Sequence, residues 1–434
     1  MSNLDADLAS SRRTVEIVRA SLARRKRAER RFRWYGLVSI FIGLSFLLIL
    51  FGSIIGNGYT AFFSTSIGLD VHLDPETIDP EGTRSPDQLA GADYDSLLKA
   101  SLRELFPEVK DRREKRALYG LVSSSASHQL REQVLAQPDL IGKTIRVRVP
   151  AKDTIDMLVK GKFDQASVGS EGKLQLQAAW VKKLEADGRI EESFNTAFFT
   201  NGDSREPESA GIRGAALGSA FTLLVTMVLS LPIGMAAAIY LEEFAPKSRW
   251  TDLIEVNINN LAAVPSIVFG LLGLAVFINF FGLSRSSALV GGLVLTLMTL
   301  PVIIIAGRSA LKAVPPSVRE AALGVGASPM QTMFHHVLPL AMPGMLTGAI
   351  IGMARALGES APLLMIGMVA FIVDIPRDLT DPATVLPVQI YLWSDSPERA
   401  FVERTSAAIL VLLAFLILMN GFAVYLRRRY ERRW

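Results

Sequence analysis

Residues 288–306 have the sequence ALVGGLVLTLMTLPVIIIA, an uncharged apolar run of 19 residues. A bilayer core about 30 Å thick is crossed by roughly 20 residues of helix, so this run predicts a membrane-spanning helix. The composition agrees, because half of the 434 residues are hydrophobic and the mean hydropathy is +0.32. A soluble domain rarely combines those two values, so a membrane protein is expected.

Five other stretches are long and apolar enough to span a membrane, which predicts an all-α polytopic membrane protein with about six spans. They cover about residues 35–56, 214–241, 254–281, 343–373 and 406–426. The first is too long for the apolar region of a cleaved signal peptide, so we expect an uncleaved anchor helix.

Lys and Arg predict how these spans are oriented. Seven of them lie in residues 24–33, before the first span, and five lie in residues 427–433, after the last. Because positive residues flanking spans stay in the cytoplasm, we expect both termini there, in a multi-pass protein of the bacterial inner membrane.

This topology places the polar residues 57–213 outside, as a periplasmic domain inserted between the first and second spans. The block is long enough to fold by itself. Its apolar spacing predicts a small α+β or mostly helical domain. The expected elements are a loop over 70–91, helical spacing over 94–118, a strand over 144–149, and helices over 151–160 and 174–186.

The loop between the fourth and fifth spans, residues 307–342, contains the sequence VPPSVREAALGVGASP at 314–329. Two prolines should end one helix, and Ser317 is expected to cap a short helix that follows. Gly326 is expected to end that helix. Small side chains on a short exposed helix would let another protein approach closely, although Glu-Ala-Ala alone is equally typical of an ordinary amphipathic connector.

The longer pattern resembles the EAA loop of ABC importer permeases. Glu320-Ala321-Ala322 is followed by a glycine six positions after the Glu, and a Leu-Pro pair stands twelve positions beyond that glycine. His336 departs from the family, which prefers an aliphatic residue there. The resemblance implies a helix that couples the chain to an ATPase, with coupling residues Arg319, Glu320, Ala321, Ala322, Gly326, Leu338 and Pro339.

Three further segments are similar to phosphate-import permeases: VPSIVFGL at 264–271, TLPVI at 299–303 and RALGESAP at 355–362. Together they resemble the PstA family of type-1 importer permeases over about residues 205–430, with an N-terminal extension. The resemblance implies three partners: a homologous second permease subunit, a cytoplasmic ABC ATPase, and a periplasmic phosphate-binding protein.

The resulting domain organisation has five parts. They are a basic cytoplasmic N-terminus (1–34), an anchor helix (35–56), the periplasmic extension (57–213), an ABC type-1 permease domain with coupling loop 307–342 (214–426), and a basic cytoplasmic tail (427–434).

Two charges, Arg355 and Glu359, lie midway along the fifth apolar stretch. A charge at mid-bilayer costs about 2.5–3.5 kcal/mol on insertion scales, so such residues normally face a cavity or each other. Four residues apart on a helix, the two can form a structural ion pair. Alternatively they line an oxyanion path, since the guanidinium fork suits phosphate oxygens.

Other polar residues of the apolar stretches are candidates for the same path. Side chains of this kind more often hold helices together by hydrogen bonds. The candidates are Ser360, Ser266, Asn260 and Thr299.

The sequence also excludes several classes of site. It has no cysteine, which rules out disulfides and thiol catalysis. No Gly-x4-Gly-Lys-Ser/Thr motif occurs, so we expect no catalytic residues and no cofactor bound by this chain, with ATP and magnesium used by the partner ATPase. His335 and His336 are adjacent and point to different helix faces, so no metal site is expected. No feature predicts nucleic-acid binding.

The expected function is therefore a permease subunit that forms half of the path for inorganic phosphate in an ATP-driven importer. Three alternatives remain open. They are a permease for sulfate or molybdate, a secondary transporter or channel working alone, and a membrane-anchored sensor or scaffold for phosphate signalling.

Overall fold

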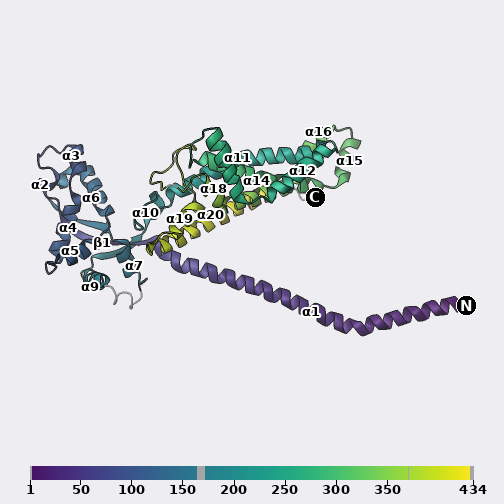
Figure 1. Ribbon diagram of the computed structural model, residues 1–434, viewed down its shortest axis with the longest axis horizontal. Coiled ribbons are helices and arrows are strands. Elements are labelled where there is room, and N and C mark those ends of the chain that lie inside the picture. The colour runs from purple at the N-terminus through teal and green to yellow at the C-terminus, as the bar shows by residue number, and fades with distance from the viewer. Residues whose placement is uncertain (1, 164–171, 370, 431–434) are drawn as a thin grey trace. The chain divides into compact units, whose positions relative to one another are not determined.

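The computed structural model describes residues 2–163, 172–369 and 371–430 (Figure 1). The chain divides into two compact units, Met1–Gly56 and Asn57–Trp434. The first consists of nearly all of helix α1 (Ser2–Gly58), whose large apolar side chains between residues 34 and 50 are mostly exposed. A helix that is apolar all round is typical of a membrane span.

The second unit begins with an α+β domain built on a three-stranded antiparallel sheet. Its strand order is β2-β1-β3, with β1 at Phe63–His72, β2 at Thr144–Pro150 and β3 at Ile190–Phe194. Alternate side chains of β1, from Ile67 to Val71, are completely buried, as expected for a strand with one face against a core.

Seven short helices gather around this sheet (Figure 1). Their inward side chains form one core with β1 and β2, in which Leu102, Leu118, Leu130 and Ile155 are almost inaccessible. The helices are α2 (Pro75–Ile78), α3 (Pro86–Gly91), α4 (Tyr94–Leu105), α5 (Arg112–Tyr119), α6 (Ser125–Ala136), α7 (Asp153–Val159) and α9 (Gly172–Ala186).

The α+β class predicted for this region is confirmed, but several predicted elements change. The strand over 144–149 and the helices over 151–160 and 174–186 appear as β2, α7 and α9. The predicted loop over 70–91 is wrong, because its start belongs to β1 and it also holds α2 and α3. The helical spacing over 94–118 belongs to two helices, α4 and α5. Phe106 ends α4, and Asp111 caps α5 through two backbone N–H groups.

The remaining residues form a helical bundle in which α11 (Arg213–Ile239), α14 (Ala288–Lys312), α17 (Leu338–Gly358) and α20 (Ala400–Tyr430) run side by side (Figure 1). Between them lie shorter segments: η3 (Tyr240–Phe244), α12 (Arg249–Ala262), α13 (Ser266–Gly273), η4 (Leu274–Phe280), α15 (Pro316–Gly324), α16 (Pro329–Gln331), η5 (Thr332–Val337), α18 (Ala361–Met365) and α19 (Leu386–Ser394). Short segments η1 (Tyr59–Phe62), η2 (Pro138–Leu140) and α10 (Thr196–Thr200) complete the described elements.

Small residues set the spacing between α14 and α17. A Cβ atom placed on Gly348 would lie 2.1 Å from the Cβ of Ala306, and one on Gly344 would lie 2.7 Å from that of Ala310. Each helix therefore presents two small residues four positions apart. This is the pattern that brings membrane helices into close backbone contact.

Five helices of the described residues are long and apolar enough to cross a membrane, and a bent pair makes six if it counts as one span. That pair is α12 and α13–η4, whose axes differ by 102°. The stretch over 254–281 is therefore two helices joined at a bend, and not one straight helix. Pro265 has an extended backbone between the two helices and has no N–H to continue a helical ladder.

The fifth predicted stretch, 343–373, is also too long. Helix α17 begins before it, at Leu338, and ends at Gly358, after which Glu359 is extended. Hydropathy extends beyond the helix because the chain after Gly358 remains apolar while its backbone turns away from the α17 axis. Pro362 lies in the first turn of the short helix α18, which follows.

Candidate functional site

The short helix α15 lies where the coupling motif was expected. Pro315 occupies its N-cap and Pro316 its first position, so Ser317 lies inside the first turn, and the prediction that Ser317 caps the helix is wrong. The helix ends at Gly324, two residues before Gly326, whose φ is +90°. That backbone conformation is accessible to glycine and strained for other residues, which explains the Gly at this position.

Arg319 holds α15 against the bundle. Its Nη2 lies 2.6 Å from Oε1 of Glu243, and its Nε lies 3.2 Å from the same oxygen. The guanidinium also donates to the carbonyls of Val314 at 2.8 Å and Leu311 at 2.9 Å. Arg319 therefore links the coupling helix to η3 and to the carboxyl end of α14, in a fork geometry that lysine cannot reproduce.

A second group of charges lies beside this one. Arg308 of α14 donates to Glu242 at 3.3 Å and to Glu255 of α12 at 2.7 Å, and Lys312 lies 3.6 Å from Glu242. These contacts connect α11–η3, α12 and α14 at the end of the bundle next to α15. Spacing along the chain does not identify these acidic partners. The adjacent pair Glu242-Glu243 at the end of an apolar run was the available signal.

The outer face of the loop is exposed and partly apolar. Glu320 and Ala321 are exposed, whereas Ala322 is buried against the bundle. Leu323 is 49% exposed and Val325 is 85% exposed. Further along, Met330 and Phe334 are also exposed, so the loop presents unpartnered apolar side chains beside its acidic residue.

Leu338 and Pro339, the last coupling residues of the motif, open α17 behind α15. Pro339 lies in the first turn, where its missing N–H leaves no intrahelical bond unmade. Together with Val318, His335 and His336, it lines a cavity of about 550 Å³ between α15, η5 and α14. Within the described residues, no group of three or more His, Cys, Asp or Glu side chains could hold a metal ion.

Arg355 and Glu359 form the ion pair that their spacing allows, with Nε 3.5 Å from Oε1. The prediction that they lie midway along a span is wrong: Arg355 is in the last turn of α17, and Glu359 is its C-cap. A cation at that position is favoured by the helix dipole. The Arg355 side chain is 47% exposed in this chain, so it remains available to another group.

The structure brings together two of the three segments that are similar to phosphate-import permeases, 264–271 and 355–362. A Cβ atom on Gly270 of α13 would lie 2.7 Å from Cα of Pro362 on α18, so the two segments meet with backbone almost touching. Ser266 opens α13 and is half-buried, and Ser360 is the half-buried residue before α18.

The two other polar candidates are placed differently. Asn260 is exposed near the end of α12, on the other side of the bend at Pro265. Thr299 is only 1% exposed, and its hydroxyl donates to the Leu295 carbonyl at 2.9 Å within α14. Its hydrogen-bonding capacity is thus satisfied inside the helix.

A buried charge cluster joins the α+β domain to the start of α20. Lys160 Nζ lies 2.6 Å from Asp156 and 2.9 Å from Glu403, and all three side chains are at most 10% exposed. In the adjoining loop, Asp203 is buried and Glu208 is half-buried. Burial raises the pKa of Asp203, although Trp393 Nε1 donates to it at 2.9 Å. Burial likewise raises the pKa of Glu208, with the nearby acids Asp153 and Glu206 adding to the effect.

Known proteins resemble the bundle. Residues 230–432 match the family model described as binding-protein-dependent transport system inner membrane component. The chain is 31% identical over 230 residues to the probable ABC transporter permease protein YqgI of Bacillus subtilis, covering 50% of this chain and 78% of that protein. It is 32% identical over 222 residues to phosphate transport system permease protein PstA 1 of Mycobacterium tuberculosis, covering 51% and 72% respectively.

This chain belongs to the family of binding-protein-dependent transport system inner membrane components. The N-terminal extension is a recognised domain as well, because residues 19–168 match a domain of unknown function, DUF3333. Among solved structures, a chain of the MetNI methionine ABC transporter aligns at 22% identity with a TM-score of 0.41, covering 50% of this chain and 95% of that one. Family and helices together confirm the predicted class, a polytopic ABC importer permease with a small α+β domain.

Proposed function

We propose that this permease is one of two subunits that form the transmembrane path for inorganic phosphate in an ATP-driven importer. The observation that carries the proposal is α15, an exposed helix held to η3 and to the carboxyl end of α14 through Arg319. Relatives at about a third identity that are named phosphate transport system permease proteins support the choice of phosphate.

The loop is where a separate ATPase would act. Leu323 and Val325 are exposed apolar side chains on a small surface, a feature typical of a protein interface. An ATPase seated there would move α15, and the Arg319 contacts would pass that motion to η3 and α14. ATP and magnesium would be bound by the ATPase, and this chain would bind no cofactor.

The path itself would include the carboxyl end of α17. Arg355 offers an exposed guanidinium, while Glu359 orients it and weakens its hold on an anion, because conduction requires binding weak enough for release. Ser266 and Ser360 lie on the elements that flank this end, and Asn260 lies across the bend, on α12. The second permease subunit would face it and complete the path, and a periplasmic binding protein would deliver phosphate.

The positive residues at both ends of the chain support a cytoplasmic location for both termini and for α15. Residues 57–213 would then lie in the periplasm, with residues 214–426 forming the permease domain and residues 307–342 its coupling loop. Cysteine labelling with a membrane-impermeant maleimide in intact and lysed cells tests this, because the chain has no cysteine of its own.

Reconstitution tests the function. The chain, its candidate partner permease, ATPase and binding protein are placed in proteoliposomes, and uptake of phosphate, sulfate and molybdate is measured with and without ATP. We expect ATP-dependent phosphate uptake that Glu320→Arg and Gly326→Val abolish. Uptake of sulfate or molybdate instead would correct the substrate. Uptake driven by an ion gradient without ATP would refute the importer.

A substitution at Arg355 tests the path. Arg355→Ala should leave membrane insertion unchanged and lower phosphate uptake sharply, and Arg355→Lys should also be impaired because the planar fork is lost. Uptake at the wild-type rate in Arg355→Ala would make the residue a structural ion-pair partner only.

A further inference from the structure

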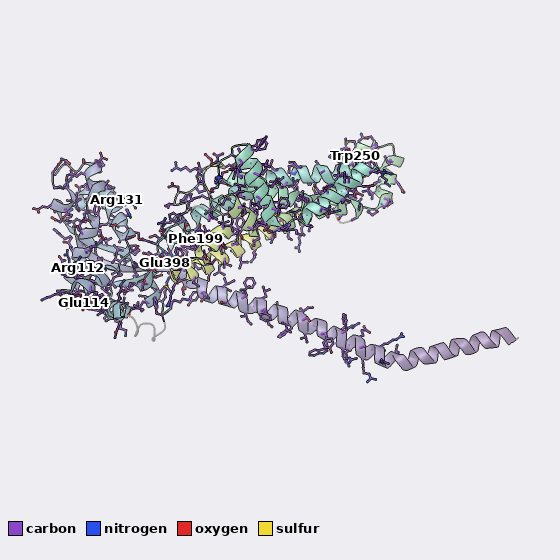
Figure 2. All side chains as sticks on the ribbon, viewed as in Figure 1. Arg112, Glu114, Arg131, Phe199, Trp250 and Glu398 are labelled. Carbon is purple, nitrogen blue, oxygen red and sulfur yellow. The ribbon has the colours of Figure 1, made fainter. Side chains whose placement is uncertain are left out.

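Four aromatic side chains form an exposed patch on the α+β domain. Tyr59, Phe63, Phe194 and Phe199 are 55%, 45%, 56% and 39% exposed, and we refer to them as the aromatic patch. Phe63 and Phe194 are directly opposite each other on β1 and β3. The Phe199 ring, labelled in Figure 2, stacks on Phe194 with ring centroids 5.7 Å apart. Phe63, Phe194 and Phe199 are thus adjacent, and Tyr59 stands four positions before Phe63 in the chain.

The patch lies at the depth where the bundle begins its apolar section. Gly58, one residue before Tyr59, packs on the backbone of α20, where a Cβ atom would lie 2.8 Å from the Ala407 nitrogen. The apolar run of α20 starts at about residue 406. Phe198, the neighbour of Phe199, is fully buried in one cluster with Ala407. Both contacts place the patch level with the membrane end of α20.

Arg404 of α20 holds the patch at this position along the helix. Its side chain is only 4% exposed, and its guanidinium donates to the Ala61 carbonyl at 3.3 Å and lies over the Phe198 ring. The segment that carries Tyr59 and Phe63 is therefore held to α20 at two points, Gly58 and Ala61. The patch cannot move away from this depth without breaking buried contacts.

Polarity changes sharply along β3. Phe194 ends the strand, and Glu192 and Glu191, two and three positions earlier, are exposed. A strand rises about 3.3 Å per residue, so the carboxylates stand roughly 7–10 Å from the ring. The headgroup layer on each side of a bilayer is about 5–8 Å thick. Rings at one end and carboxylates at the other therefore match the boundary between headgroups and water.

We propose that the aromatic patch rests in the lipid headgroup layer and anchors the α+β domain to the membrane surface. Aromatic rings are enriched at this boundary, where an apolar ring meets a wet surface. The patch includes Tyr59, whose ring is apolar and whose hydroxyl can bind water, the combination that suits this boundary. The anchor requires only that the bundle span a membrane.

The experiment uses the absence of cysteine in the sequence. The full-length chain carrying Phe194→Cys is labelled with a nitroxide and placed in nanodiscs of phosphatidylethanolamine and phosphatidylglycerol. Collision rates with oxygen, which concentrates in lipid, and with a water-soluble nickel chelate report depth. Glu192→Cys on the same strand is the aqueous control, and Leu418→Cys on the exposed face of α20 is the lipid control.

We expect the ratio of oxygen to nickel collisions at position 194 to be several-fold above that at 192 and below that at 418. A ratio equal to that at 192 would overturn the anchor, since the patch would then lie in water. Low collision rates with both reagents would also overturn it, in favour of cover by protein. Tyr59→Cys repeats the test if Phe194→Cys misfolds. The measurement needs no transport, so its outcome is independent of the phosphate proposal.

Discussion

Replacing Arg319 by alanine should loosen α15 from the bundle. The substitution leaves the Glu243 carboxylate and two carbonyls without their donor. Breaking a fully buried ion pair costs about 3–5 kcal/mol, and an exposed pair contributes at most about 1 kcal/mol. The side chains of Arg319 and Glu243 are 24% and 18% exposed, so we expect a loss between these limits, about 2–3 kcal/mol.

Hydrogen exchange of α15 measures this loss directly. Since about 1.4 kcal/mol changes an equilibrium tenfold, α15 amides should exchange roughly 30 to 140 times faster in Arg319→Ala. Arg319→Lys should give a smaller increase, because it keeps the charge and loses the fork. In the reconstituted importer, the same variants should reduce the ATPase stimulation that the loaded binding protein produces.

A matched control separates this contact from a general loss of charge. Arg249→Ala removes an exposed guanidinium at the first residue of α12 and should leave α15 exchange unchanged. If α15 exchanges at the wild-type rate in Arg319→Ala, the link between α15 and η3 does not stabilise the loop, and the reasoning is refuted. Equal acceleration in α14 and α17 would mean that the bundle itself had unfolded.

Three further changes test other parts of the structure. Gly348→Ala forces a methyl group onto Ala306 and should lower stability by about 1–3 kcal/mol, whereas Gly421→Ala, which meets no atom within 4 Å, should not; thermal unfolding in detergent compares them. Lys160→Met leaves the buried carboxylates of Asp156 and Glu403 without their shared cation and should lower the unfolding temperature, with a cost of about 3–5 kcal/mol. Because burial raises the pKa of Glu208, the native state holds that proton more tightly than the unfolded chain. Its contribution is therefore complete at acid pH and is lost as pH rises through the native pKa, so Glu208→Gln should be more stable than wild type at pH 8 and lose that advantage toward pH 4. A constant difference across that pH range would contradict the burial of an ionising Glu208.

The membrane class and the number of apolar stretches could be predicted because they depend on local composition. The route of the backbone could not. Hydropathy along 254–281 does not reveal that Pro265 turns the chain through 102°, and hydropathy beyond Gly358 does not reveal that α17 has ended. Such irregular backbone is tolerated at membrane depth where protein buries it, so only the packing of α13 against α18 shows why the chain can turn there.

The candidate site shows the same division. The motif around Glu320 located α15, but it did not show that Arg319 faces Glu243, which is 76 positions away in the chain. Glu242 and Glu243 are identical in type and adjacent, yet one meets Arg308 and the other meets Arg319. Their directions around the end of α11 decide which partner each finds, and no spacing rule supplies that.

The sequence by itself determined that this protein has several apolar stretches long enough to cross a membrane, that a short motif helix lies between two of them, and that residues 57–213 are a polar block. Those properties follow from runs of side chains that are near one another in the chain. Only the tertiary structure decided that Arg355 sits at a helix end, that α15 is fastened through Glu243, and that four aromatic rings meet beside α20. Each of these depends on the packing of segments that are distant in sequence, where burial and contact geometry, and not local pattern, select the partners.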